Sequence, residues 1–319
     1  MVFTVGLIGL GKVGAFYDLN SPNTITHLNA ISKDIRFSLS FAYDPIESTC
    51  DYVKEYYDIE NVFHNIVDIQ NNKLQADLIV VASPTNSHLA SIQSMLEFIS
   101  PIMVLCEKPL ADNLIDGQKI AELCAQKNIN IATNFMRRSL PLFGELKERI
   151  ASQFPGEHDV VVKYSGCFRN NGSHFVDLIS YFYGEPESVL WRTSEKANKS
   201  EFKVRAIVSH KNAVCSYIPL SSISVVDHEV EILTDDFKLI IGRAGRDVHL
   251  YKVEGDPDFP GAFHYAKNSR LDSDYLNFQK YVYNDLYMAL NSGTLSSNLC
   301  DIDSSLRNVK FIKELTDYE

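Results

Sequence analysis

The stretch "FTVGLIGLGKVG", residues 3–14, joins a short apolar run to three glycines spaced G-x-G-x-x-G. The run predicts a buried β-strand, and the glycines predict a tight turn that opens a helix. The first glycine permits the turn, the second lets the backbone approach a pyrophosphate, and the third allows close packing, with the phosphates at the helix N-terminus. The stretch therefore predicts a dinucleotide site formed by Gly9, Leu10, Gly11, Lys12 and Val13.

Downstream of this turn, apolar runs alternate with helical patterns. "RFSLSFAYD", "ADLIVVASPT", "PIMVLCEKP" and "INIATNF" read as strands, and residues 87–99 and 117–128 have helical spacing of their apolar side chains. Near-continuous apolar strands separated by helices are typical of a parallel sheet covered on both faces. We therefore predict an α/β, doubly wound Rossmann domain over residues 1–138.

The pattern changes over residues 139–319, where strands dominate. Two hairpins are predicted about Lys211-Asn212 and Asp235-Asp236, and the loop "EGDPDFPGAF" is expected to lead to a helix over about 274–290. A last helix is predicted over about 302–316, and it can pack against the first domain. These patterns predict a C-terminal α+β domain with a mostly antiparallel open sheet, used for substrate binding and oligomerisation.

Composition narrows the class of protein. The net charge is −11 and no basic stripe is present, which argues against nucleic-acid binding. No apolar run approaches the ~20 residues that cross a bilayer, and the N-terminal segment lacks the basic region of a signal peptide. Six cysteines are scattered without metal-ligand spacing. We expect a cytoplasmic protein with neither disulfides nor a metal, and no contact with membranes.

Asp44 ends the second predicted strand, where an acid commonly binds the ribose hydroxyls of NAD. It lies 30 positions (44 − 14) beyond Gly14, more than the usual ~20, and the segment "DLNSPNT" supplies the extra length. A carboxylate here would repel a 2′-phosphate, so NAD is favoured over NADP. The alternative is that Asp44 is a turn residue before Pro45.

The ends of the later strands supply further candidates, because ligands of doubly wound sheets bind at the carboxyl ends of the strands. The predicted cofactor-binding residues there are Ser83, Pro84, Thr85, His88, Glu107, Lys108 and Asn134. Lys108 closes a buried strand, where partial desolvation could make its amine useful in catalysis. From its position alone, a lysine that reaches out to solvent fits the pattern better.

Five motifs, "GLIGLGKVG", "VASPTNSH", "CEKPLA", "NFMRR…P" and "NNGSHFVDL", occur in the order found in the Gfo/Idh/MocA oxidoreductases, the family of glucose–fructose oxidoreductase and inositol dehydrogenase. The chain resembles that family over essentially its whole length. The resemblance implies that Lys108 and His174 are catalytic residues beside the nicotinamide. It also implies a homodimer or homotetramer formed through the open sheet, and a Lys108–Pro109 bond that can be cis, a state found in about 5–6% of X–Pro bonds.

The residues before His174 depart from the family pattern. Many members have an Asp that pairs with the catalytic His, whereas this chain has Asn170 there. An amide can orient an imidazole but cannot stabilise imidazolium by charge, so His174 should be a weaker base. Whether His174 or Lys108 takes the proton is left open, and Asp177 is a substitute partner or a first-turn acid. The predicted substrate-binding residues are Lys108, Arg138, Asn170, Asn171, His174 and Asp177, with His27 a weaker candidate for the substrate entrance.

These features predict an NAD(P)-dependent oxidoreductase that moves a hydride between nicotinamide and a hydroxyl-bearing carbon. By resemblance, the substrate is a sugar, an inositol or a nucleotide sugar, with surface-polysaccharide pathways the first expectation. One alternative is a reductase of an enone, imine or tetrapyrrole on the same fold. The other is a non-catalytic NAD-binding sensor, which the missing acid at position 170 favours.

Overall fold

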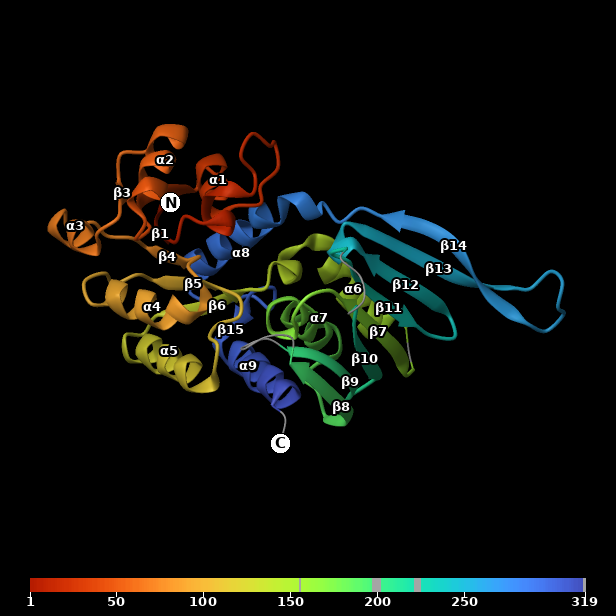
Figure 1. Cartoon of the computed structure of the whole chain (residues 1–319). Coiled ribbons are helices and arrows are strands. Elements are labelled where there is room, and N and C mark those ends of the chain that lie inside the picture. The colour runs from red at the N-terminus through yellow and green to blue at the C-terminus, as the bar shows by residue number, and fades with distance from the viewer. Residues whose placement is uncertain (155, 197–201, 221–224, 318–319) are drawn as a thin grey trace. The chain divides into compact units, whose positions relative to one another are not determined.

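The computed structural model describes residues 1–154, 156–196, 202–220 and 225–317. The chain divides into two compact units (Figure 1). The first comprises Met1–Ser139 and Leu276–Lys310, and the second comprises Leu140–Tyr275 and Phe311–Glu319. The first unit therefore contains a segment that follows the second unit in the sequence.

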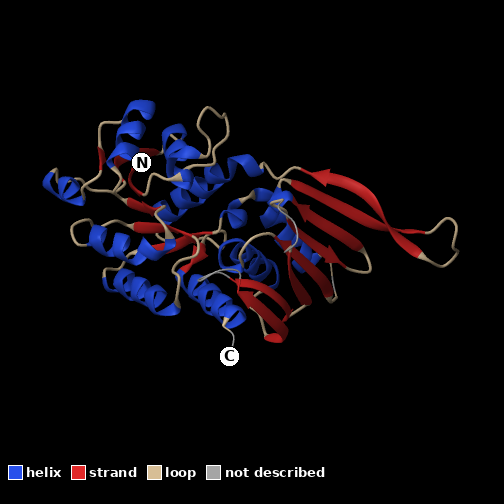
Figure 2. Ribbon diagram, viewed as in Figure 1, coloured by secondary structure: helices blue, strands red, loops and turns tan. Residues whose placement is uncertain are grey.

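A seven-stranded sheet forms the centre of the first unit (Figure 2). Neighbouring strands pair in parallel, except the last edge strand, which is antiparallel to β6. Parallel pairing requires crossover connections, which explains the helices between these strands. Across the sheet the order is β15 (Cys300–Asp301), β6 (Asn130–Asn134), β5 (Met103–Glu107), β4 (Leu78–Val81), β1 (Phe3–Ile8), β2 (Phe37–Tyr43) and β3 (Val62–Phe63).

Helices cover both faces of this sheet, so its strands are apolar on both sides. Side chains of α1 (His27–Lys33), α2 (Glu47–Tyr57) and α8 (Phe278–Ser292) pack into one cluster. Those of α3 (Ile66–Asn71), α4 (His88–Leu96), α5 (Leu114–Gln126) and the first part of α9 (Ile302–Thr316) pack into the other. The predicted doubly wound domain is confirmed.

The second unit contains an eight-stranded sheet and two helices, α6 (Pro141–Ser152) and α7 (Ser173–Tyr183). Among the strands that the structure describes in this unit, β7 (His158–Tyr164) and β10 (Ala213–Pro219) pair in parallel, and the other neighbours are antiparallel. In β9 and β10 buried side chains alternate with partly exposed ones, as expected for a sheet covered on one face. The order is β14 (Phe263–Leu271), β13 (Asp247–Gly255), β12 (Phe237–Gly242), β11 (His228–Leu233), β7 (His158–Tyr164), β10 (Ala213–Pro219), β9 (Phe202–His210) and β8 (Ser188–Lys196).

Both predicted hairpins, β9–β10 and β11–β12, are confirmed, although Glu201 of the first predicted strand lies outside the described residues. The connection after "EGDPDFPGAF" was predicted wrongly. That loop joins β13 to β14, and α8 begins only at Phe278, after a short 3₁₀ turn. The mixed residues of β14 hide the strand from a periodicity argument, because its stability comes from pairing with β13.

Three structural findings bear on the class of protein. None of the six cysteines forms a disulfide. Among the described residues, no three His, Cys, Asp or Glu side chains are grouped so that they could hold a metal ion. Within the same part of the chain, no helix combines the length and hydropathy needed to cross a membrane.

Candidate functional site

The glycine turn after β1 has two structural glycines and one that faces open space. A Cβ on Gly14 would lie 2.1 Å from the Gly9 carbonyl oxygen, and Gly9 has a φ of +92° with a Cβ position 2.5 Å from the Ser83 nitrogen. In contrast, a Cβ on Gly11 would meet nothing within 4 Å. The protein therefore packs against Gly9 and Gly14 and leaves room beside Gly11, as required for backbone contact with a pyrophosphate.

The helical pattern expected around residues 26–32 is present as α1, but only a short helical turn directly follows the glycines. A π-helical turn covers Lys12–Phe16, and α1 begins only at His27, after an irregular loop. A five-residue helix contributes little aligned dipole, so phosphate binding here would depend on the backbone N–H groups of the turn itself. Asp18 explains the interruption, because its carboxylate accepts hydrogen bonds from the Ile25 and Thr26 amides and from the Thr26 hydroxyl.

Asp44 is 8% exposed and holds the glycine turn in place. Its Oδ2 accepts a hydrogen bond from the Leu10 amide at 2.9 Å, and its Oδ1 accepts one from the Ile46 amide at 3.0 Å. The turn interpretation is therefore confirmed for part of its role. Each carboxylate oxygen has two lone pairs, so these bonds still leave acceptor capacity for ribose hydroxyls.

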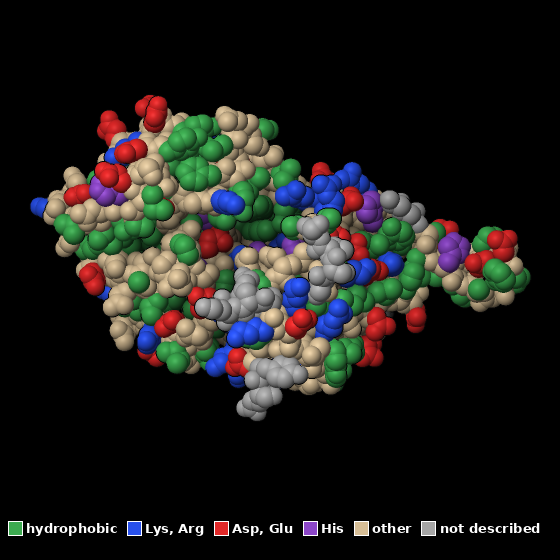
Figure 3. All heavy atoms as spheres, viewed as in Figure 1, with side chains coloured by type: hydrophobic (Ala, Val, Ile, Leu, Met, Phe, Trp, Pro, Cys, Tyr) green, Lys and Arg blue, Asp and Glu red, His purple; other side chains and the backbone are tan. Residues whose placement is uncertain are grey.

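Aromatic side chains gather near this turn. Figure 3 shows hydrophobic side chains on the surface over the region of α1 and α2. Tyr17, Tyr52 and Tyr56 are 56%, 45% and 40% exposed, and the Tyr56 hydroxyl donates to Asn20. The irregular loop between the π-helical turn and α1 is therefore held by hydrogen bonds to Tyr56 of α2 as well as by those to Asp18.

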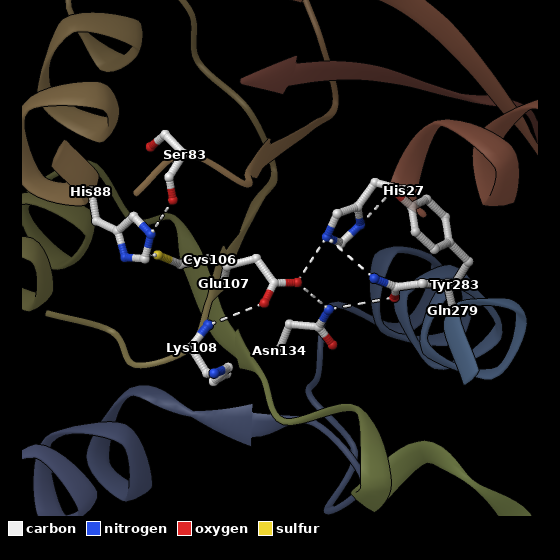
Figure 4. Close-up of polar contacts among 9 residues, drawn as sticks. All are labelled: His27, Ser83, His88, Cys106, Glu107, Lys108, Asn134, Gln279 and Tyr283. Atoms are coloured by element: carbon white, nitrogen blue, oxygen red, sulfur yellow. Dashed lines mark hydrogen bonds and ion pairs between the residues drawn. The ribbon is translucent and has the colours of Figure 1, made fainter. Parts of the chain in front are cut away.

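Glu107, at the carboxyl end of β5, is the centre of a buried polar network (Figure 4). Its Oε1 lies 2.9 Å from His27 Nε2 and accepts a hydrogen bond from Asn134 Nδ2 at 2.7 Å. The Gln279 side chain contacts both Asn134 and His27, and the Tyr283 hydroxyl lies 3.3 Å from His27 Nδ1. The network joins α1, β5, β6 and α8, which all belong to the first unit.

The electrostatics of the network keep Glu107 ionised. Burial alone would raise the pKa of Glu107, but hydrogen bonds from His27 and Asn134 and the charges of His27 and Lys108 lower that pKa below its ordinary value. Asn134 closes β6 next to Glu107 and is 4% exposed. The predicted residues Glu107, Lys108 and Asn134 are therefore brought together at one sheet edge, and the Lys108–Pro109 bond is cis, as predicted.

His88 lies behind this edge instead of facing a ligand. It is 1% exposed, and its Nε2 lies 2.9 Å from the Ser83 carbonyl oxygen while its Nδ1 lies 3.1 Å from that of Leu110. The Cys106 thiol is 3.2 Å from the same Nδ1 (Figure 4). The expectation that His88 borders the cofactor is revised, because its ring holds the loop with Ser83, Pro84 and Thr85 against the segment after Lys108.

Two further expectations are corrected by burial. His27, a candidate for the substrate entrance, has a fully buried side chain inside the Glu107 network. Arg138, a predicted substrate-binding residue, is only 8% exposed, so it is not a solvated surface arginine, and the neighbouring Arg137 is 4% exposed. Both arginines lie in the short 3₁₀ turn that follows β6.

In the second unit, the predicted substrate residues surround the start of α7. His174 is the second residue of this helix and is partly exposed, whereas Asp177 is 1% exposed. Asn171 Nδ2 donates to the Ser165 carbonyl at 2.7 Å, and the Asn170 carbonyl accepts from the Ser173 hydroxyl. Asn171 thus stabilises the turn that presents His174, and Asn170 itself is exposed.

Comparison with known proteins identifies the first unit. Residues 3–135 match the GFO_IDH_MocA family, described as an oxidoreductase family with an NAD-binding Rossmann fold. The domain over residues 3–135 is therefore of the Gfo/Idh/MocA NAD-binding Rossmann type. Gly11 and Asp44 both lie within this matched range.

The individual curated relatives are distant in sequence. YceM of Salmonella typhimurium is 28% identical over 148 residues, 46% of this chain and 43% of YceM. Myo-inositol 2-dehydrogenase of Thermotoga maritima is 27% identical over 199 residues, 57% of this chain and 55% of that enzyme. The chain thus spans about half the length of these curated relatives.

Structural similarity to solved proteins extends over more of the chain than the sequence similarity does. The WlbA dehydrogenase of Bordetella pertussis, solved with NADH and UDP-GlcNAcA, superposes with a TM-score of 0.74 at 17% identity. The match covers 99% of this chain and 95% of WlbA. The two-sheet architecture is therefore common to both proteins.

Sequence patterns did not indicate two members of the Glu107 network. Gln279 and Tyr283 are fully buried residues of a helix that was assigned to the other domain. The one available signal was the spacing of Gln279 and Tyr283, four apart on one helix face.

Proposed function

We propose that this protein is an NAD-dependent oxidoreductase that moves a hydride between nicotinamide and a hydroxyl-bearing carbon of a sugar, an inositol or a nucleotide sugar. The observation that carries the proposal is the ionised Glu107 beside Lys108 at the end of β5, in the same sheet as the open glycine turn after β1. When bound, NAD supplies the hydride chemistry, and the protein supplies position and electrostatics.

The chain's own residues would bind the cofactor, stabilise charge on the substrate oxygen and accept its proton. The amides around Gly11 and the carboxylate of Asp44 would hold the pyrophosphate and the ribose. Lys108 would donate a hydrogen bond to the substrate oxygen and stabilise negative charge that develops there. His174 would accept the hydroxyl proton, while Lys108 remains the hydrogen-bond donor to the same oxygen.

The substrate class is supported by the names of related proteins. The Thermotoga maritima relative acts on myo-inositol, and WlbA was solved with a nucleotide sugar. We further propose a homodimer or homotetramer formed through the half-exposed face of the second unit's sheet. A reductase of a non-sugar substrate and an NAD-binding sensor are the competing functions, and the amide of Asn170 in place of an acid supports the sensor.

The test is NADH formation in the presence of the purified protein, NAD or NADP, and a panel of inositols, sugars and nucleotide sugars. We expect turnover with NAD in preference to NADP, because Asp44 repels a 2′-phosphate. Lys108→Ala and His174→Ala should each lower kcat by about 10²–10⁴, with NADH binding retained. Thr85→Ala, at the partly exposed loop after β4, serves as a control for a cofactor contact outside the chemistry.

The outcomes separate the three functions. Turnover that survives in both variants would remove Lys108 and His174 from the mechanism and favour a different reductase. Tight NADH binding without turnover on any substrate, in the wild-type protein, would favour the sensor. Absence of NADH binding would contradict the proposed function altogether.

A further inference from the structure

His27 has a fully buried imidazole that the proposed chemistry does not use. It is the first residue of α1, and Thr26 caps this helix by accepting a hydrogen bond from the Asn29 amide. The Thr26 hydroxyl in turn donates to Asp18 at 2.7 Å. The loop and the cap therefore fix where the imidazole lies, and a solvated role for it is excluded.

The contacts of the ring define which nitrogen carries the proton. His27 Nε2 lies 2.9 Å from Glu107 Oε1, while the Tyr283 hydroxyl lies 3.3 Å from Nδ1 (Figure 4). Because a carboxylate oxygen can only accept, Nε2 carries the hydrogen of the bond to Glu107. Tyr283, His27 and Glu107 thus form a chain of contacts that runs from α8 through α1 to β5.

The two oxygens of Glu107 have different surroundings. Oε1 is held by His27 and by Asn134 at 2.9 and 2.7 Å. Oε2 makes one long contact among the residues that the structure describes, 3.4 Å from the backbone nitrogen of Lys108. The side chain is 13% exposed, so the carboxylate is clamped through one oxygen and retains acceptor capacity at the other.

We propose that His27 is a positioning residue for the cofactor: by clamping Oε1 of Glu107, it keeps the second oxygen available to accept a hydroxyl of the nicotinamide ribose. This role rests on the proposed NAD-dependent function. It deepens that function by adding three residues, His27, Gln279 and Tyr283, from elements outside the glycine turn. α8 is thereby part of the cofactor site although it follows the second unit in sequence.

The charged and titratable groups around Glu107 determine what removal of the clamp would do. His27 faces it from α1, Tyr283 from α8, and Cys106 and Lys108 from its own strand and the residue after it. Asn134 and Gln279 are neutral. Burial pushes the pKa of Glu107 up and His27 pulls it down, so loss of His27 should raise that pKa.

The test compares His27→Leu with His27→Gln, whose amide can still donate to Glu107. NADH binding is measured by nicotinamide fluorescence from pH 5 to 8, with a thermal melt for each variant. We expect His27→Leu to weaken NADH binding about 10-fold or more at neutral pH, and more strongly as the pH falls. His27→Gln should stay close to the wild type, and His64→Leu, at an exposed histidine of the same unit, is the matched control.

A second variant, Tyr283→Phe, keeps the inference testable if His27→Leu fails to fold. Tyr283→Phe keeps the buried ring and removes only the hydroxyl that contacts His27, so it should fold and weaken NADH binding about 2–10-fold. Wild-type affinity and pH dependence in both His27→Leu and Tyr283→Phe would overturn the positioning role. So would an equal loss in His27→Gln and His27→Leu.

The ionisation of Glu107 separates this inference from the proposed function. In protein labelled with ¹³C at the glutamate carboxyls, and with Glu107→Gln used for assignment, His27→Leu should raise the titration midpoint of Glu107 without any cofactor. An unchanged midpoint would overturn the clamp even if NADH binds. If His27→Leu raises the midpoint but the wild-type protein does not bind NADH, the clamp is supported and the proposed function is contradicted.

Discussion

At the scale of single residues, buried charge is kept where several donors converge on it. Asp18 and Glu107 are both carboxylates in the interior of the first unit, and burial opposes the ionisation of each. Three hydrogen bonds from Ile25 and Thr26 compensate at Asp18, and His27 and Asn134 compensate at Glu107. Asp18 therefore stabilises the loop before α1, and Glu107 organises the polar network of the candidate site.

Asp18→Asn should destabilise the protein by about 1–3 kcal/mol at neutral pH, because an amide cannot accept the same three bonds as strongly. Burial raises the pKa of Asp18 but the hydrogen bonds from Thr26 and Ile25 lower it below its ordinary value. A lowered folded-state pKa stabilises the fold above the unfolded-state pKa, and this contribution is lost as the pH falls through the folded-state value. The difference from wild type should therefore shrink in acid below about pH 4.

The measurement is urea unfolding of wild type and Asp18→Asn between pH 3 and 7. Asp51→Asn, at an exposed acid on α2, is the control and should stay within about 0.5 kcal/mol of wild type. A difference between wild type and Asp18→Asn that grows as the pH falls would contradict the assignment of an ionised, hydrogen-bonded Asp18.

At the scale of elements, the glycine turn separates steric from functional requirements. Gly14 is needed by the fold, because a Cβ there would lie 2.1 Å from a carbonyl oxygen. Gly11 has a φ of −73°, which any residue can adopt, and open space beside it. Packing within the protein therefore does not require a glycine at position 11, which is consistent with the proposed dinucleotide site.

Gly11→Ala should fold normally and lose NADH affinity by about 10-fold or more, because the added methyl group occupies the space beside the backbone amides. Gly14→Ala should instead lose about 1–3 kcal/mol of stability. Thermal melts and NADH titrations of both variants distinguish these effects. Wild-type NADH affinity in Gly11→Ala would show that the turn does not approach a dinucleotide.

At the scale of the whole molecule, a helix late in the sequence completes the first unit. Val282, Tyr283 and Leu286 of α8 lie in the same hydrophobic cluster as residues of β1 and β2. Tyr283 and Tyr287 also contact the Phe37 ring edge-on. The first unit therefore depends on residues that a division of the sequence at residue 138 would remove.

Leu286→Ala should lower the free energy of unfolding by about 2–5 kcal/mol, because its fully buried side chain would leave a cavity in this cluster. Met288→Ala, two residues away and 59% exposed, should change stability by less than about 0.5 kcal/mol. Chemical unfolding of the two variants measures the contrast. Equal effects would contradict the packing of α8 into the first unit's core.

The sequence alone determined the parallel sheet, the glycine turn, and the strand-end positions of Asp44, Glu107, Lys108 and Asn134. These follow from local periodicity and from the rule that ligands bind at the carboxyl ends of parallel strands. Only the tertiary structure decided that His27 and His88 are buried, that the turn is followed by a π-helical turn, and that α8 supplies Gln279 and Tyr283. The physical reason is that burial and hydrogen-bond partners depend on contacts between residues up to 256 positions apart, and such contacts leave no periodic mark on the chain.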